Sequence, residues 1–305
     1  MRLYTHEEYL NHKVAESHAE RPERLQRVLA HLRTTPHLQN LTWQTPQPAS
    51  QTQIRAAHSQ SHIDFLNRSR PEDGIIPIDP DTWMSPKSLA AAHLAAGAVC
   101  EAVDILVEQV DKRAFCLSRP PGHHAERDSA MGFCLLNSVA IGALHALAQP
   151  GIERVAILDF DVHHGNGTVD IFKDNPAVLV CSSFQYPYYP NRLHDLVRPN
   201  LVYSPLPSGT ASNAFRQRIE ADWLPALKQH QPDLILISAG FDGHRDDPLA
   251  QFQLEDEDYK WITELIVSEA EKYAQGRVIS TLEGGYDVDA LARCVALHID
   301  ALQNE

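Results

Sequence analysis

One stretch of sequence decides the fold class: residues 155–166, which read VAILDFDVHHGN. Four apolar residues are followed at once by carboxylates and imidazoles. Side chains of an extended segment alternate between two faces, so Asp159, Asp161 and His163 are expected to point the same way. Burying such groups beside an apolar run is costly without a metal or full pairing. The stretch predicts a core strand that ends in a catalytic metal site; the alternative is a hydrogen-bonded polar cluster that caps the strand.

Similar apolar runs recur along the chain and alternate with helical patterns. We expect strands at Ala114–Leu117, Val155–Asp159, Ala177–Cys181, Leu234–Ser238 and Val278–Thr281. We expect helices at Pro22–Leu32, Lys87–Val110, Ser138–Ala148, Ala214–Gln229, Glu257–Gln275 and Val288–Leu302. This alternation predicts an α/β protein with a parallel sheet and helices on both faces. No repeat or long linker divides the chain, so residues 1–305 are expected to form one domain.

Local signals refine these boundaries. Ser85 followed by Pro86 predicts a helix N-cap, and Gly276 is placed to end a helix in the left-handed conformation. The first eighty residues predict one or two helices and long loops. The segment Tyr186–Thr210 is too long for a passive connection, so we expect it to form the rim of a site.

Bulk properties exclude several classes of protein. The formal net charge is −14, which gives no electrostatic support for direct nucleic-acid binding and favours cationic substrates. The five cysteines show no paired spacing, which is typical of reduced thiols. No secretory signal is visible, and no apolar run is expected to reach the ~20 residues that span a bilayer. We therefore expect a cytoplasmic protein that does not bind membranes.

Polar motifs follow four of the predicted strands. They read SRPPGHHAE at 118–126, DFDVHHGN at 159–166, AGFDGH at 239–244 and LEGGYD at 282–287. In open α/β sheets, ligands bind beyond the carboxyl ends of the strands. We therefore expect these motifs to meet at one edge of the sheet. Catalytic zinc takes three protein ligands and leaves one position open, and Asp161, His163 and Asp242 supply three.

The remaining polar residues of these motifs predict acid–base chemistry. One ring of the pair His123 and His124 can act as general base, with the other giving electrostatic help. Asp159 is a natural acceptor for one imidazole, and Asn166 could orient the other. The hydroxyl of Tyr286 could stabilise an oxyanion. Each motif alone has a structural interpretation, such as a solvated His pair or a packed aromatic, and their joint placement favours function.

Other histidines are expected to be structural. His244 lies two residues beyond Asp242 at ligand-like spacing, but three ligands are already present, so we assign it to a loop or rim. His164 is the member of the 155–166 stretch least expected to touch the metal. The other histidines with a structural assignment are His6, His12, His37, His58, His93, His145, His230 and His298.

At these motifs the sequence resembles the histone deacetylase family, in the branch of bacterial deacetylase-like amidohydrolases and acetylpolyamine amidohydrolases. The matching segments are HAERPERL at 18–25, RPPGHHAE at 119–126, GFCLLN at 132–137, DFDVHHGNGT at 159–168, SAGFD at 238–242 and EGGY at 283–286. The resemblance implies the arginase/deacetylase fold, one domain around an eight-stranded parallel sheet. It also implies zinc held by Asp161, His163 and Asp242.

The resemblance further implies roles for individual residues. His124 would be the general base and acid, His123 its electrostatic partner, and Tyr286 the residue that polarises the carbonyl. The substrate channel would run between Phe133 and an aromatic residue of the Tyr188-Tyr189 pair, here Tyr189, with Gly132 contributing backbone. A structural K+ would use Asp159, Asp161, His163, Ser182 and Ser183, and a second such site would lie near Phe172 and Val178.

Two departures from the family pattern affect these implications. Asn166 replaces the Asp of one branch, so the tuning of His124 can differ. Residues 191–194, NRLH, lack the glycine-rich run of many relatives, which changes the expected rim.

The sequence therefore predicts a zinc-dependent amidohydrolase that deacetylates a primary amine. Its expected substrates are acetyl-lysine in peptides or proteins, or an acetylated cationic small molecule such as an acetylpolyamine. The alternatives are an arginase-like ureohydrolase with two manganese ions and a noncatalytic acyl-amine-binding or partner-binding protein on the same fold. A homo-oligomer that narrows the entrance of the channel is a further expectation.

Overall fold

An eight-stranded parallel sheet forms the centre of the single α/β domain, in the order β2-β1-β5-β10-β9-β6-β7-β8. The computed structural model describes residues 1–38 and 41–303. The strands are β1 Arg2–Tyr4, β2 Thr42–Gln44, β5 Arg113–Cys116, β6 Val155–Asp159, β7 Val178–Gln185, β8 Leu201–Leu206, β9 Leu234–Ala239 and β10 Val278–Leu282. A separate antiparallel pair joins β3 Ile76–Pro77 to β4 Trp83–Met84.

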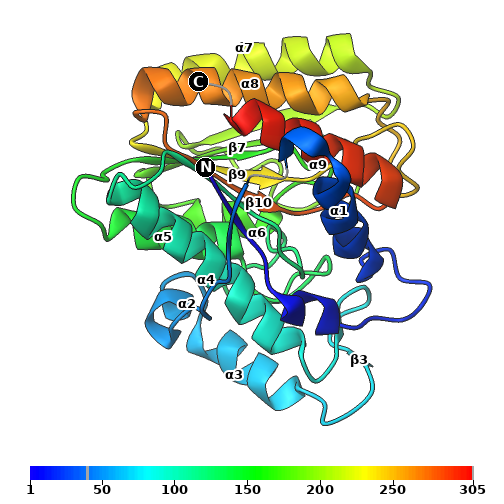
Figure 1. The fold of residues 1–305 in the computed structure, drawn as a ribbon. Helices are drawn as coiled ribbons and strands as arrows, with labels where there is room; N and C mark the ends of the chain where they lie inside the picture. Colours follow the sequence, from blue (N-terminus) through cyan, green and yellow to red (C-terminus); the bar gives the residue numbers. More distant parts are fainter. Residues whose placement is uncertain (39–40, 304–305) are drawn as a thin grey trace.

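Helices cover both faces of the sheet, as the alternating pattern predicts (Figure 1). One face carries α1 Glu23–Thr34, α7 Ser212–His230, α8 Asp256–Tyr273 and α9 Val288–Gln303. The other carries α2 Gln51–Ala57, α4 Ser88–Val107, α5 Ser138–Leu147 and α6 Asn166–Phe172, with α3 Gln60–Ser69 beyond them. The short 3₁₀ helices are η1 Glu7–Asn11 and η2 Pro36–Leu38.

Two hydrophobic layers follow from this arrangement. Alternate residues of each strand point to opposite faces, so Ala156 and Leu158 of β6 pack in one layer and Val155 and Ile157 in the other. All five residues of β6 are buried, which explains why its sequence is almost wholly apolar. Its last residue, Asp159, is the first buried carboxylate of the site.

The four strands that carry the polar motifs are neighbours at the centre of the sheet. Their order is β5-β10-β9-β6, and all pairs are parallel. Because parallel strands end at the same edge, the four motifs meet there. The five predicted strands are confirmed, with ends that differ by up to four residues from the observed ones.

Sequence analysis missed several short elements. The edge strands β1 and β2 have three residues each, and β8 lies inside the segment predicted as rim. The first eighty residues hold three α-helices instead of one or two, and α6 was also missed. Ser50 and Ser59 cap α2 and α3 through their side chains. Helices this short offer too few apolar repeats to be recognised by periodicity.

Two predictions about α4 are wrong. The helix begins at Ser88, where the N-cap Lys87 makes no side-chain cap; instead Ser88 Oγ accepts from Ser85 N at 2.8 Å. By length and composition α4 could cross a membrane, contrary to expectation, but 67% of its apolar window is buried within the domain. The prediction for Gly276 is confirmed, because its φ is +77° where α8 ends.

Candidate metal and catalytic site

Three donor groups converge at the carboxyl edge of the sheet. The Nδ1 atom of His163 lies 3.0 Å from Asp161 Oδ1 and 3.0 Å from Asp242 Oδ2. Asp161 and His163 follow β6, whereas Asp242 follows β9, and all three side chains are buried. One donor atom from each of the three residues lies within 4.8 Å of the others. One imidazole and two carboxylates at this spacing match the donor set of a catalytic zinc site, which keeps a fourth position open.

Backbone groups hold the two carboxylates in place. Val162 N donates to Asp242 Oδ1 at 2.9 Å, and Gly284 N donates to Asp161 Oδ2 at 2.9 Å. A Cβ at residue 284 would lie 2.1 Å from Asp242 Oδ2, so only glycine allows this close approach. The Gly-Gly segment therefore packs directly against both carboxylates.

The cluster holds negative charge that a cation would neutralise. Burial and the charge of Asp161 raise the pKa of Asp242. Burial opposes ionisation of Asp161 too, but the charges of His123 and His163 outweigh it and lower its pKa. Burial opposes protonation of His163, but Asp242 and Asp161 outweigh it and raise its pKa to about 10. In the metal-free protein a proton on His163 compensates the carboxylates, and a divalent cation would take its place.

The tandem histidines differ in their partners. His123 Nδ1 lies 2.9 Å from Asp159 Oδ2, whereas His124 Nδ1 lies 2.7 Å from Asn166 Oδ1. Burial disfavours a charged His123, but Asp159 and Asp161 outweigh it and raise its pKa well above the ordinary value. Burial and the charge of His123 hold the pKa of His124 well below it. Two imidazoles whose pKa values are shifted in opposite directions thus lie side by side, with ring centres 4.0 Å apart.

The loop that carries Tyr286 is fixed from two sides. Asp247 Oδ2 accepts from Tyr286 N at 2.6 Å. The buried guanidinium of Arg24 donates to the carbonyls of Gly285 and Glu283, each at 2.6 Å, and lies 4.8 Å from the Tyr286 ring centre. Tyr286 is 8% exposed, so its ring is largely fixed before any ligand arrives.

A narrow pocket of about 170 Å³ leads from the surface to these groups. Its walls include the predicted residues Gly132, Phe133 and Tyr189, and Tyr189 packs edge-on against His124. Gly132 and Phe133 both have left-handed backbone, with φ of +57° and +68°. The strain at Phe133 turns a bulky aromatic side chain into the wall. The full lining is Asp81, His124, Gly132, Phe133, His163, Tyr188, Tyr189, Leu249 and Tyr286.

The residues expected around monovalent cations have partners of their own. Ser183 Oγ lies 3.4 Å from the Asp159 carbonyl, and Ser182 Oγ lies 3.0 Å from His164 Nδ1. His164 is therefore turned away from the three metal donors. Near the second implied site, the Asn200 amide donates to the carbonyls of Phe172 and Val178, each at 2.9 Å. An amide nitrogen thus lies where those carbonyls converge.

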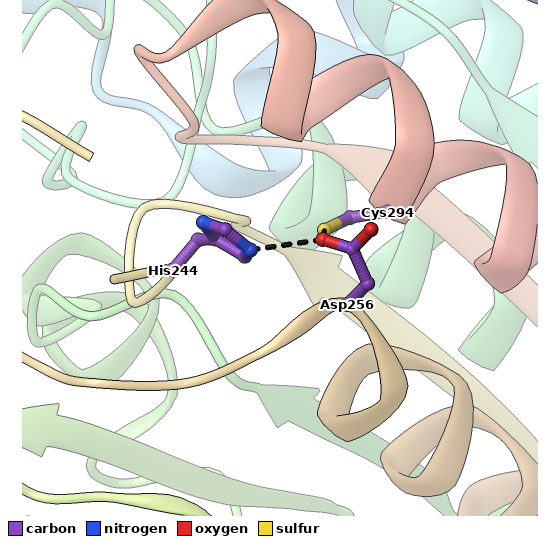
Figure 2. A group of neighbouring side chains, drawn as sticks. All are labelled: His244, Asp256 and Cys294. Atoms are coloured by element: carbon purple, nitrogen blue, oxygen red, sulfur yellow. Dashed lines mark hydrogen bonds and ion pairs between the residues drawn. The ribbon is translucent and has the colours of Figure 1, made fainter. Parts of the chain in front are cut away.

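A second group of possible ligands, His244, Asp256 and Cys294, lies outside this site (Figure 2). His244 Nδ1 accepts from Asp246 N at 3.1 Å, so Nε2 carries the hydrogen and donates to Asp256 Oδ1 at 2.9 Å. Asp256 also accepts from Arg293 Nε at 2.8 Å. Both ring nitrogens of His244 are used and the carboxylate is already neutralised. This group is an ion-pair network that joins α8 to α9 and the loop after β9.

Several supporting residues were missed by sequence analysis. Arg119 is fully buried and forms a bidentate ion pair with Glu20, at 2.6 and 2.8 Å. Glu20 also accepts from Arg24 at 2.9 Å, which links the N-terminal segment to the Tyr286 loop. Glu283 Oε2 accepts from Gly122 N and His123 N at 2.6 and 3.1 Å. The available signal was the presence of these charged residues in the segments HAERPERL, RPPGHHAE and EGGY, but most of their partners lie far away in the sequence.

Comparisons with known proteins agree with this geometry. The model of the histone deacetylase domain matches residues 18–302. The histone deacetylase-like amidohydrolase of Pseudomonas aeruginosa is 33% identical over 94% of this chain and 77% of its own. The human polyamine deacetylase HDAC10 is 32% identical over 94% of this chain and 45% of its own.

A solved structure of a histone deacetylase domain has the same fold. The structure of the HDA15 HD domain superposes with a TM-score of 0.92 at 30% identity, covering 100% of this chain and 91% of that one. The arginase/deacetylase-type sheet implied by the resemblance is therefore confirmed. The chain belongs to the histone deacetylase family.

Proposed function

We propose that this hydrolase is a zinc-dependent deacylase that cleaves the amide of an acetylated primary amine. The observation that carries the proposal is the convergence of Asp161, His163 and Asp242 beside two imidazoles, one held by a carboxylate and the other by an amide. Zinc in this donor set would supply Lewis-acid polarisation of the amide carbonyl and would acidify water. The residues of the chain would supply the proton transfers and the binding.

The His pair would divide the proton transfers. Burial and the charge of His123 lower the pKa of His124, and its Nδ1 is engaged by Asn166, so Nε2 would be free to take a proton from the attacking water. The same nitrogen would then give that proton to the leaving amine. His123, held by Asp159, would keep its positive charge and stabilise negative charge that develops next to it.

Tyr286 would act on the carbonyl oxygen. Its hydroxyl would donate a hydrogen bond to the oxyanion as the carbonyl carbon becomes tetrahedral. Burial, together with the charge of Asp242, raises the pKa of Tyr286 well above its usual value, so the hydroxyl keeps its proton. Asp247 and Arg24 would hold the loop in the geometry that this requires.

The pocket favours a linear acylated amine. The aromatic side chains of Phe133, Tyr188 and Tyr189 would enclose the methylenes of an acetyl-lysine or acetylpolyamine. The net charge of −14 would attract the cationic remainder of the substrate. The names of the relatives, one a polyamine deacetylase and one an amidohydrolase, support both substrate classes.

The alternatives are less well supported. A binuclear ureohydrolase would need further carboxylates around a second metal, and Asn166 occupies a position where one would be needed. A noncatalytic binding protein would not need a tyrosine in the pocket wall whose backbone and ring are held by Asp247 and Arg24. We also propose a structural K+ bound by Asp159, Asp161, His163, Ser182 and Ser183, and a cytoplasmic location, which the five unpaired, buried cysteines favour.

Metal analysis and a product assay test the proposal together. The purified protein should contain about one zinc per chain and release acetate from acetyl-lysine peptides or acetylpolyamines. Tyr286→Phe should keep the zinc and lose most of its activity, because the hydroxyl acts mainly in the transition state. A metal-free protein with full activity, or a fully active Tyr286→Phe variant, contradicts the mechanism.

A further inference from the structure

We propose that Glu126, held by Arg192 of the rim loop, is a positioning residue that fixes the side-chain orientation of Asn166 and thereby the tautomer of His124. The inference rests on the proposed role of His124 as the base. The buried carboxylate of Glu126 accepts from Asn166 Nδ2 at 2.7 Å, and Asn166 Oδ1 lies 2.7 Å from His124 Nδ1. A chain of three hydrogen-bonded side chains thus links the pocket to the rim.

The Asn166 amide can adopt only one of its two orientations here. Its Nδ2 donates to the Glu126 carboxylate and lies 3.3 Å from the His124 carbonyl. Turned by 180°, the amide would place its oxygen against both of these acceptors, with no hydrogen between them. Glu126 makes the energy difference between the two amide orientations large, because its carboxylate is a stronger acceptor than a carbonyl and is buried.

The fixed amide in turn fixes His124. Because Asn166 presents its oxygen, His124 must carry its hydrogen on Nδ1 and leave the lone pair on Nε2. The opposite amide orientation would stabilise the other tautomer, whose Nε2 carries hydrogen and cannot accept a proton. An asparagine, unlike an aspartate, has this second orientation available. A chain that uses Asn166 therefore needs a residue that excludes it.

Arg192 holds Glu126 from the solvent side. Its Nε lies 2.7 Å from Glu126 Oε1 and its terminal nitrogen 2.8 Å from Oε2, a bidentate pair. The residues on either side, Asn191 and Leu193, have φ of +51° and +59°. Such left-handed backbone at residues other than glycine is unfavourable, and it persists only where surrounding contacts compensate. The rim loop is thus bent around the contact that holds Glu126.

The tautomer of His124 can be read directly in the zinc-loaded enzyme. ¹⁵N chemical shifts of histidine-labelled protein, assigned with a His124→Gln variant, distinguish Nδ1–H from Nε2–H. In the unmodified enzyme we expect Nδ1–H. Glu126→Met, which keeps the length of the side chain and removes the acceptor, should populate Nε2–H and lower kcat about 10- to 100-fold, with KM changed less than threefold.

Two results would overturn the inference. One is a folded Glu126→Met variant in which His124 keeps Nδ1–H and kcat is unchanged. The other comes from a polarity swap that does not rely on that variant. Asn166→Asp alone should lose activity, because the new carboxylate would face that of Glu126. Adding Glu126→Gln should place an amide donor between them and regain at least part of kcat. Equal kcat in the single and double variants contradicts the proposed contact.

The rim loop supplies a matched control. Arg192→Gln should move the His124 tautomer and kcat in the same direction as Glu126→Met, but less. Arg198→Gln, in the same loop, removes an exposed pair with Asp174 and should change neither. The tautomer signal does not depend on which amide is hydrolysed. A wrong substrate assignment would therefore leave it intact, whereas a wrong role for Glu126 would not.

Discussion

Two clusters in this molecule carry nearly the same donor types, yet only one has the properties of a metal site. Asp161, His163 and Asp242 are all buried and face one another, and within residues 1–38 and 41–303 no arginine or lysine is among their partners. In the group of His244, Asp256 and Cys294 (Figure 2), each imidazole nitrogen already has a hydrogen-bond partner. The carboxylate of Asp256 is also paired with Arg293.

The difference lies in how the charge is compensated. In the first cluster two carboxylates share one imidazole, so negative charge remains for a cation to neutralise. In the second cluster the guanidinium of Arg293 already neutralises the carboxylate of Asp256. Proximity of ligand atoms is therefore a weaker indication of a metal site than the net charge and the free lone pairs of the group.

The largest effect is expected at the first cluster. Asp242→Asn should abolish zinc binding and lower acetate release about 1000-fold, since the proposed zinc would lower the activation barrier by several kcal/mol. The metal-free variant should nevertheless unfold at a similar temperature. It loses the pair of Asp242 with His163, but it also loses one of two facing carboxylates, and Asn Oδ1 can still accept from Val162 N. Metal analysis, the activity assay and calorimetry measure the three outcomes. Full zinc occupancy in the variant contradicts the ligand assignment.

The next largest effect is expected in the pH dependence of zinc binding at the first cluster. Asp242 and Asp161 outweigh burial and raise the pKa of His163 to about 10, so the metal-free cluster holds a proton at pH 7 that zinc must displace. We expect about one proton released per zinc and an affinity that rises about tenfold per pH unit below that pKa. Titration calorimetry in buffers of different ionisation enthalpy counts the protons. Zinc binding without proton release would show that His163 is neutral beforehand.

The same raised pKa sets the sign of a stability effect. A histidine with a folded pKa above its unfolded value stabilises the metal-free protein fully below the unfolded pKa, near 6.5. That contribution is lost as the pH rises through about 10. The metal-free protein should therefore lose stability in this alkaline window, and Asp242→Asn should lose less.

The central part of the fold could be predicted from sequence because its signals are local. Val155–Asp159 is an uninterrupted buried strand, and its observed bounds equal the predicted ones. The edge strand β8 could not be predicted, because Leu201–Leu206 is partly exposed and contains a proline. Its residues were therefore included in the predicted rim segment Tyr186–Thr210.

The candidate site shows the same division. The three candidate metal ligands and the His pair stand in short motifs, so the types and spacing of these residues predict them. The residues that hold them, such as Glu20, Arg119 and Asp247, pair with groups far away in the chain. A single sequence gives the charge of these residues but not the partner. Arg192 was recognised only as part of an unusual rim. Its contact with Glu126 joins segments 66 residues apart, which a single sequence does not pair.

A smaller effect is expected at the second cluster. Asp256→Asn removes the charge that pairs with Arg293 and weakens the acceptor of His244. Because the Asp256 side chain is 30% exposed, we expect a loss of only about 1 kcal/mol in the free energy of unfolding. Zinc content and kcat should not change. Denaturant titration measures the loss, and a variant with reduced zinc content would show that the two clusters are coupled.

The smallest effect is expected for Cys294→Ser. The thiol is buried and lies 3.6 Å from Asp256 Oδ1, a contact that a serine hydroxyl can keep, so stability should change by less than about 1 kcal/mol. Burial and the charge of Asp256 raise the pKa of Cys294, so zinc would have to displace a proton from the thiol as well as compete with Arg293 for Asp256. Under excess zinc, both the unmodified protein and Cys294→Ser should hold one ion per chain. A second ion that disappears in Cys294→Ser would make the second cluster a metal site and remove the distinction based on charge compensation.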